Sequence, residues 1–351
     1  MSSVDVLLRR KLSMQISTGG NPDHNLSGAA QPVLLEIAER LKIAMKEVQS
    51  SREQLPLDVA HTHSQCVLSA GSVAQQVRAF YFLTSMGSPP ESQIAACAAD
   101  LEKATLVYVS WAKGLLGCAS LPARKLLSAP CAAVVKCVVL LLTKASGRAL
   151  DAPDAAMVDS AAEKLKSLEL SGVAAARRLL GESEQLIRDA SEELHEAADE
   201  AAAAATEGGS GEESEEEGEE EGDADGESDL LGQLEVSAPV LRLVDAAREL
   251  VALSGGRGVN GCGERDKVLF MMVTCAQAAS EQIDSLACAA HEGDFDSLCS
   301  YGQSVGKVVG KLRLLLAREC GFGEEQALND IATRVDACAK EFVALAAKRW
   351  S

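Results

Sequence analysis

The stretch LNDIATRVDACAKEFVAL, residues 328–345, carries the clearest structural signal in the sequence. Its apolar side chains recur at intervals of three and four residues, which places them along one face of an α-helix. A narrow apolar seam of this kind packs one helix against another. We therefore expect either a helix within a bundle or a free dimerisation zipper, whose seam is formed by Leu328, Ile331, Val335, Cys338, Phe342 and Leu345.

Helical spacing extends through much of the chain, with similar apolar stripes at residues 33–48, 101–115 and 268–286. The 351 residues are 47% hydrophobic but only 3% aromatic, so Ala, Leu and Val supply most of the apolar content. One window, LVYVSW at 106–111, is rich in strand-forming residues, but it lies inside a longer helical stripe and has no turn signal beside it. The sequence predicts an all-α protein built from amphipathic helical bundles.

Prolines divide these helical segments. Proline is tolerated in the first turn of a helix but disrupts its interior. We therefore expect helices to start near Pro32, Pro56, Pro89, Pro90, Pro122, Pro130, Pro153 and Pro239. Two further helices are expected to start near Ser171 and Asp294.

An acidic, low-complexity window separates two helical blocks. Residues 207–229 hold 13 acidic residues, six glycines and no basic residue, so they have little to bury and their charges repel one another. We expect them to form a disordered linker between an N-terminal helical bundle, 32–206, and a C-terminal helical bundle, 230–351. Residues 1–31 are expected to form a flexible tail. The pattern leaves open whether the two blocks share one core.

The acidic linker carries two candidate phosphorylation sites, Ser210 and Ser214. Each has a glutamate three residues further on, which is typical of substrates of acidophilic, casein-kinase-type enzymes. A phosphate at either serine would add charge to a linker that repulsion already extends. The alternative is an inert spacer.

Composition also limits the ligands and the compartment. The net charge is −19, and no stretch concentrates Lys and Arg as direct nucleic-acid binding requires. Eleven cysteines, an odd number in a long chain, favour a reducing compartment in which thiols fill helix interfaces. The longest apolar run, 131–142, is shorter than the ~20 residues of a membrane span. We expect neither a membrane segment nor direct binding of nucleic acid.

Three motifs that suggest chemistry lack the context that it needs. The G-x-S-x-G match at 302–306 has no preceding strand and no histidine after it, so its glycines, with Gly310, predict close helix packing instead. The G-x-G-x-x-G match at 256–261 follows a helical stretch, which predicts a flexible interhelical loop. His61, His63 and Cys66 are too few for a zinc site. We expect no catalytic residue, metal or cofactor.

Several segments resemble the cyclin-D-binding protein (GCIP) family. They are VAQQVRAFYFL at 73–83, the stretch 174–197 that leads into the acidic insert, IDSL at 283–286, and the stretch 304–316. The resemblance covers about residues 32–346, and the chain departs from the family in its tail and in the glycine-rich segment 254–263. It implies an all-α protein of the nucleus and cytoplasm that binds D-type cyclins and helix-loop-helix transcription factors and negatively regulates the cell cycle.

Partner binding in such a protein would act by sequestration. No helix carries the basic region through which helix-loop-helix regulators bind DNA. A partner's amphipathic helix would instead dock on an apolar seam. We expect this seam to be Leu328, Ile331, Val335, Phe342 and Leu345, in a non-enzymatic interaction protein that regulates cell-cycle progression and transcription.

A second interpretation is a vinculin-like or talin-like scaffold or cytoskeletal adaptor. Ala-rich helical bundles joined by a linker also suit that architecture. Binding to actin or microtubules distinguishes it from the regulator, for which no such binding is expected.

Overall fold

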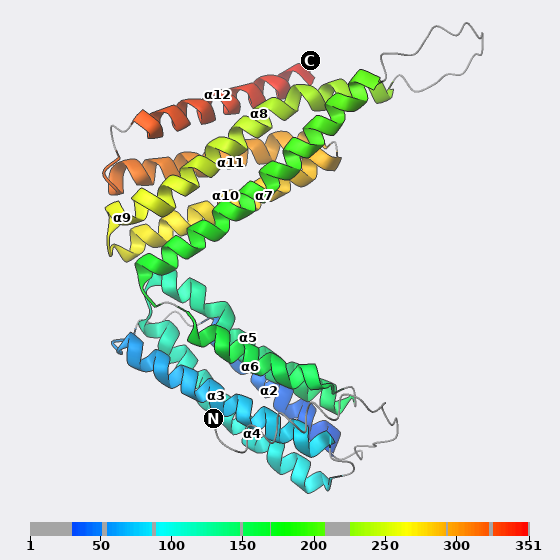
Figure 1. The fold of residues 1–351 in the computed structure, drawn as a ribbon, viewed down its shortest axis with the longest axis vertical. Coiled ribbons are helices and arrows are strands. Elements are labelled where there is room, and N and C mark those ends of the chain that lie inside the picture. Colours follow the sequence, from blue (N-terminus) through cyan, green and yellow to red (C-terminus); the bar gives the residue numbers. More distant parts are fainter. Residues whose placement is uncertain are drawn as a thin grey trace, which may run out of the picture. The chain divides into compact units, whose positions relative to one another are not determined.

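The computed structural model describes residues 30–50, 55–85, 89–147, 150–168, 170–207, 225–292, 294–322 and 326–349. Within these ranges the regular structure is helical and contains no strand (Figure 1). The expected all-α fold of helical bundles is confirmed. The chain divides into two compact units: unit 1 is Met1–Cys118 with Leu127–Leu168, and unit 2 is Ala119–Leu126 with Glu169–Ser351.

Unit 1 is a bundle of long helices. It contains α2 (Ala30–Ser50), α3 (Val59–Ser85), α4 (Glu91–Cys118), most of α5 (Leu121–Ser146) and α6 (Ala152–Lys166). Helix α4 packs against α2 and α3, and α3 also packs against α6. The stripe expected at 101–115 is buried, and the largest fully buried side chains are Tyr108, Phe80, Leu34, Ile37, Leu41, Ile94, Leu101, Leu115, Leu116, Leu127 and Leu141.

Two of the prolines do not start helices, and the prediction is wrong for them. Pro130 lies inside α5 and Pro239 inside α8 (Asp225–Leu253). On either side of Pro130, Leu127 and Cys131 are fully buried in the core. Burying two such side chains offsets the ~3 kcal/mol that an internal proline costs a helix.

Among the described helices, only α5 is long and apolar enough to cross a membrane. Of its most apolar window, 56% is buried inside the protein. The phenolic hydroxyl of Tyr108 donates a hydrogen bond of 2.9 Å to the carbonyl of Cys131, which joins α4 to α5 within the core. Packing in the core of unit 1 therefore uses part of the apolar surface of α5.

Unit 2 is a second bundle. Its long helices are α7 (Gly172–Glu207), α8, α10 (Asp266–Glu292), α11 (Phe295–Glu319) and α12 (Gln326–Arg349). Between α8 and α10 lie a π-helical turn, η2 (Ser254–Gly258), and the short helix α9 (Val259–Cys262). Helix α7 packs against α8 and α10, while α12 packs against α8 and α11.

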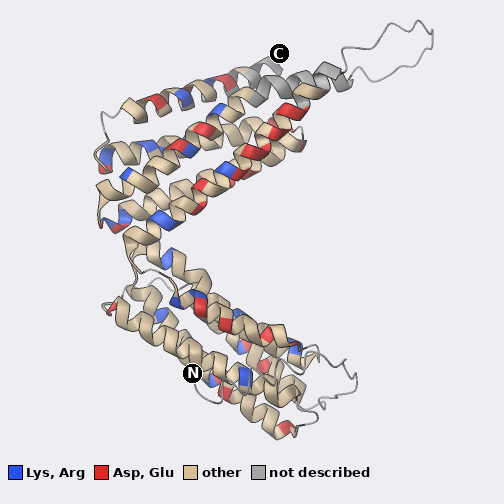
Figure 2. Cartoon of the chain, viewed as in Figure 1, with Lys and Arg blue, Asp and Glu red and all other residues tan. Residues whose placement is uncertain are grey.

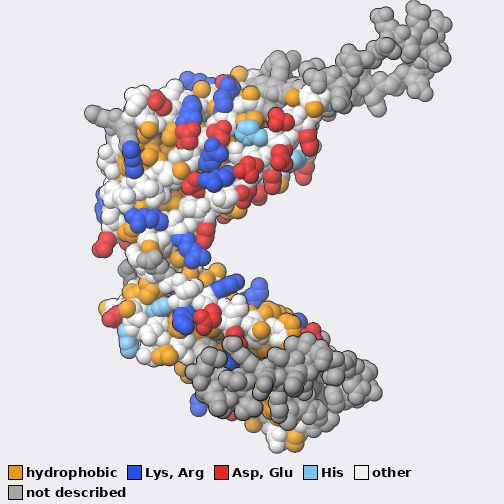
Figure 3. Space-filling model, viewed as in Figure 1, with side chains coloured by type: hydrophobic (Ala, Val, Ile, Leu, Met, Phe, Trp, Pro, Cys, Tyr) orange, Lys and Arg blue, Asp and Glu red, His pale blue; other side chains and the backbone are white. Residues whose placement is uncertain are grey.

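The boundary between the two units does not coincide with the acidic window, contrary to the division expected from sequence. Helix α7, which was expected to belong to the N-terminal bundle, packs in unit 2 and buries Ala176, Leu180 and Ile187 there. Its acidic side chains lie on the opposite, exposed side and gather along it in Figures 2 and 3. The acidic window thus joins α7 and α8, two neighbouring helices of unit 2. A run of charged residues predicts a solvated segment, and such a segment need not be a domain boundary.

Two predicted segments lie largely outside the described residues. Residues 1–29 and 208–224, the latter with Ser210 and Ser214, are not described. Ala30 and Gln31, which were assigned to the tail, instead form the start of α2.

The starts of three helices meet near Asp266 in unit 2. Leu121 N–H, at the start of α5, donates to Asp266 Oδ2 at 2.8 Å. A Cβ on Gly172, at the start of α7, would lie 3.3 Å from Asp266 Oδ1. Helix N-termini carry a partial positive charge, so the Asp266 carboxylate stabilises the N-termini of α5, α7 and α10. This contact attaches residues 119–126 to unit 2.

We predict that Asp266→Ala lowers the free energy of unfolding of unit 2 by about 1 kcal/mol, since it removes a helix cap. Hydrogen exchange should show faster exchange at the Leu121 amide. Asp284→Ala, at an exposed position of the same helix, is the control and should leave this amide protected. Equal exchange in both variants would contradict the capping role.

A buried carboxylate joins α5 to α6 in unit 1. Asp154 accepts from Lys144 Nζ at 2.6 Å and from the backbone N–H of Asp151 at 2.9 Å. Burial opposes ionisation of Asp154, but the hydrogen bonds from Lys144 and Asp151 and the Lys144 charge outweigh it, so the pKa of Asp154 lies below its usual value. The pair contributes stability while Asp154 is ionised.

We predict that Lys144→Met destabilises unit 1 by about 1–3 kcal/mol at pH 7, because it leaves a buried carboxylate without its charged partner. The pKa of Asp154 is lowered on folding, so this stability is present above the ordinary value of 3.8 and is lost as the pH falls through the folded-state pKa. Thermal melts of the two proteins should therefore converge as the pH falls through the folded-state pKa of Asp154. Lys166→Met, which removes an exposed pair with Glu163, is the control and should change the melt little at any pH.

Candidate partner-binding groove

An open groove of about 700 Å³ lies between α2 and α4 in unit 1. Both helices supply its walls: α2 contributes Arg40, and α4 contributes a row of side chains at helical spacing. The lining residues are Arg40, Ala99, Glu102, Lys103, Leu106, Val107 and Ser110.

Ion pairs join α2 and α4 at two levels. Arg40 makes two hydrogen bonds to the Glu102 carboxylate, Nε to Oε1 at 2.6 Å and Nη2 to Oε2 at 2.9 Å. The hydrogen bond with Glu102 raises the pKa of Arg40 above its usual value, so the guanidinium stays charged. Further along both helices, Lys113 Nζ lies 3.1 Å from Glu47 Oε2. The two pairs link the exposed edges of α2 and α4, which pack together through buried side chains such as Leu41 and Leu101.

Apolar side chains remain exposed between these two levels. On α4, Leu106 is 43% exposed and Val107 is 50% exposed; on α2, Ile43 is 61% exposed. Ile43 follows Arg40 by three residues and precedes Glu47 by four, so all three lie on one face of α2. The exposed apolar surface is therefore bounded by an interhelical ion pair on each side.

This groove explains the strand-like window at 106–111. Tyr108 and Val109 are buried, whereas the adjacent Leu106 and Val107 are exposed. Helix α4 is thus apolar on two sides, which hides the usual alternation of apolar and polar faces. The sequence contained a signal for this second apolar face: a helix with one apolar face does not need four consecutive apolar or aromatic residues, such as LVYV at 106–109. The window is helical, as expected, but its second apolar face was not predicted.

The predicted seam on α12 lies mostly in the core of unit 2. Leu328 is 2% exposed, and Ile331 and Val335 are each 5% exposed. They face the bundle that α12 forms with α8 and α11, so the bundle-helix alternative fits the structure better than a free zipper. The side chains of Phe342 and Leu345 are not among those described. Partner binding at this seam would require α12 to leave the bundle, and it stays a prediction.

Other motifs have structural roles where the structure describes them. Ser304 donates to the carbonyl of Ser300 at 3.0 Å inside α11, as a helical serine does and a strained nucleophile does not. Nothing lies within 4 Å of a Cβ placed on Gly310, so the expected close helix approach is not found there. His63 Nε2 lies 3.0 Å from the carbonyl of Leu165, which joins α3 to the end of α6.

The glycine-rich segment is helical, and the expected flexible loop is wrong. Residues 254–258 form the π-turn η2 and residues 259–262 form α9, before the chain turns at Gly263 with φ = 57°. The buried hydroxyl of Ser254 donates to the carbonyl of Leu250 at 2.7 Å. The segment thus continues α8 without opening into a phosphate-binding turn.

Burial favours the protonated form of five cysteine thiols. In unit 1, the hydrogen bond with Cys131 and burial raise the pKa of Cys66 far above its usual value. Burial also raises the pKa of Cys97, Cys137, Cys275 and Cys338. Within the described parts of the chain, no group of three or more His, Cys, Asp or Glu side chains is arranged to hold a metal ion.

No protein-family model matches this sequence, and no curated protein matches it significantly. The resemblance to the cyclin-D-binding protein family therefore rests on sequence segments alone.

We predict that Ile331→Asp or Val335→Asp destabilises unit 2 by about 2–5 kcal/mol, because each places a carboxylate in an apolar core. Thermal unfolding followed by circular dichroism measures the loss. Asn329→Asp introduces the same group at an exposed position of α12 and should melt like the wild type. An unchanged melt for the two core variants would show that the seam is open to partners.

Proposed function

We propose that this chain is a non-enzymatic interaction protein that binds an amphipathic helix of a protein partner in the α2–α4 groove. The observation that carries the proposal is the pair of exposed apolar side chains, Leu106 and Val107, in the lining of a groove beside the Arg40–Glu102 ion pair. Scattered apolar residues are normal on a protein surface, whereas apolar residues gathered in a groove favour binding.

The dimensions of the groove suit a helix. The ion-paired residues of α4, Glu102 and Lys113, are eleven positions apart, about 16 Å along the helix axis. Three turns of a docked helix span the same length and present apolar side chains at helical spacing to the floor. Lys103 is exposed at the rim, so an acidic residue beside the partner's apolar face would complement it.

The resemblance to the cyclin-D-binding protein family supplies the class of partner. We propose a D-type cyclin or a helix-loop-helix factor, held in a complex that can neither activate a kinase nor bind DNA. The protein would then act as a negative regulator of cell-cycle progression and transcription in the nucleus and cytoplasm. The acidic window and the low aromatic content are consistent with a regulator of this type but do not select the partner.

A scaffold or cytoskeletal adaptor is the second candidate. Its support is the division into two all-helical units, with α5 contributing residues to both. Cosedimentation with actin filaments or microtubules tests it directly. Sedimentation of the wild type and of groove variants alike would favour the adaptor over the groove-binding regulator.

We predict that replacing both Leu106 and Val107 with Glu weakens partner binding at least about tenfold, since it removes apolar contact from the centre of the groove and adds charge. The measurement is titration calorimetry of the full chain against a purified D-type cyclin and, separately, a helix-loop-helix domain. Both substituted positions are exposed, so the thermal melt should stay within about 2 °C of the wild type.

The matched control for the groove variant is Leu68→Glu. Leu68 is an exposed leucine on α3 of the same unit and does not line the groove. It should bind each partner as the wild type does. Equal affinity of the groove variant and this control would overturn the groove as the binding surface, whereas no binding by the wild type would overturn the proposed partners.

A further inference from the structure

A pair of cysteines lies in unit 2, where the end of α9 meets the end of α11. Cys262 and Cys320 are joined there by a disulfide, with their Cα atoms 5.0 Å apart and a separation of 58 positions in sequence. They are 3% and 8% exposed. The other cysteines, all within the described residues, are free thiols. One pair has therefore been brought together in a chain whose remaining thiols stay reduced.

Glycine makes this approach possible. A Cβ on Gly261 would lie 2.6 Å from the carbonyl oxygen of Cys320, which is closer than a real Cβ atom comes to another heavy atom. One turn earlier, a Cβ on Gly258 would lie 2.7 Å from Leu316 of α11 and 2.8 Å from Met272 of α10. Gly258 and Gly261, which belong to the G-x-G-x-x-G match at 256–261, thus let the two cysteine-bearing segments come into contact.

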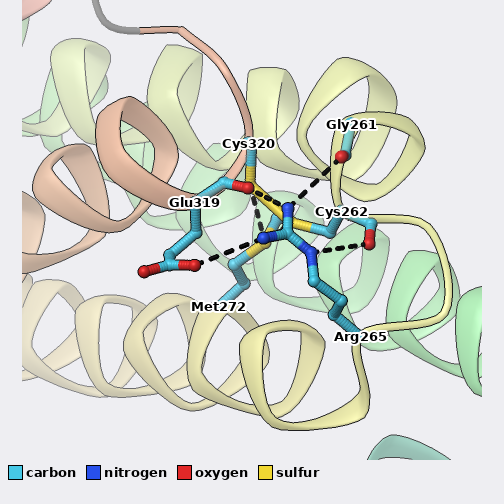
Figure 4. A network of polar contacts seen from close by, with 6 residues as sticks. All are labelled: Gly261, Cys262, Arg265, Met272, Glu319 and Cys320. Carbon is cyan, nitrogen blue, oxygen red and sulfur yellow. Dashed lines mark hydrogen bonds and ion pairs between the residues drawn. A yellow bond between two sulfur atoms is a disulfide. The ribbon is translucent and has the colours of Figure 1, made fainter.

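A single arginine holds the two segments together without using sulfur. Arg265 Nε donates to the carbonyl of Cys262 at 3.1 Å, and Nη2 donates to the carbonyl of Gly261 at 3.4 Å (Figure 4). On the other side of the guanidinium, Nη2 also donates to the carbonyl of Glu319, and Nη1 lies 3.3 Å from Glu319 Oε2. Arg265 therefore holds the residue before Cys320 and the backbone of Cys262 in one network.

The same site also accommodates the reduced pair. Met272 Sδ lies 3.5 Å from Cys262 Sγ and 3.8 Å from Cys320 Sγ, so either thiol can donate to it once the disulfide is open. The thioether is a weak acceptor in an otherwise apolar setting. Reduction would thus leave two buried thiols with a partner and with their backbones still held by Arg265.

We propose that Cys262 and Cys320 form a reversible redox pair that controls the stability of unit 2. In oxidation, the two thiols lose two protons and two electrons to a disulfide such as oxidised glutathione, which is released as two molecules of glutathione while the Cys262–Cys320 bond forms. In reduction, a thiolate attacks the more exposed sulfur, Cys320, and a second thiol completes the exchange. The proposal is independent of the groove in unit 1.

The disulfide closes a loop that contains α10 and α11, and it fixes the chain immediately before the connection to α12. Opening it restores chain entropy to the unfolded state and destabilises the fold. The melting temperature of unit 2 should fall by roughly 10 °C on reduction.

The test is a redox titration of the full-length protein in glutathione buffers of increasing oxidised fraction. Free thiols are alkylated at each step and assigned by peptide mass spectrometry, and each sample is melted. We expect Cys262 and Cys320 to lose alkylation together, the melting temperature to rise with them, and both changes to reverse with dithiothreitol. Alkylation of both cysteines at every ratio, or oxidation without a change in melting, would overturn the proposal.

Three variants separate the pair from general thiol effects. Cys320→Ser should abolish the redox-dependent shift, whereas Cys288→Ser, at an exposed free cysteine, should retain it. Arg265→Met tests the positioning role of the guanidinium: the disulfide should re-form several-fold more slowly after reduction. A shift that survives in Cys320→Ser would assign it to other cysteines and refute the pair.

Discussion

Burial of narrow aliphatic stripes between long helices is the interaction on which both units depend. With aromatics at 3% of the residues, the cores are filled by Leu, Ile, Val and Ala, which bury modest areas each. Long helices compensate because each presents many such positions to its neighbours. Polar groups inside the bundles are accordingly few and have specific tasks: Tyr108 links α4 to α5, Asp154 links α5 to α6, and Asp266 caps α5.

The α2–α4 groove follows from the same constraint. A helix that packs on one face leaves its other residues to solvent, and there the sequence of α4 continues to supply apolar side chains. Buried side chains keep α2 beside α4, and the ion pairs of Arg40 with Glu102 and of Lys113 with Glu47 bridge the two helices at the surface while Leu106 and Val107 stay exposed. Exposed apolar surface between rigid elements is well suited to binding because little has to be ordered when a partner docks.

The cysteine pair shows a different use of close packing. Gly258 and Gly261 let backbone and sulfur approach, and Arg265 supplies hydrogen bonds that do not depend on the oxidation state. The close approach at the glycines, the hydrogen bonds of Arg265 and the disulfide all hold this site. The first two can therefore keep its geometry when the disulfide is reduced. In Cys66, by contrast, the hydrogen bond with Cys131 and burial favour the thiol.

The sequence by itself determined the helical class, the stripe at 101–115, the start of α11 at Asp294 and the existence of a long helix ahead of the acidic window. These follow from spacing and capping, which are local. Only the tertiary structure decided that α7 belongs to unit 2, that Ile331 and Val335 of α12 are buried, that Leu106 lines a groove, and that Cys262 meets Cys320. Each of these depends on which helices become neighbours, and an apolar stripe specifies that it will be buried but not against which partner.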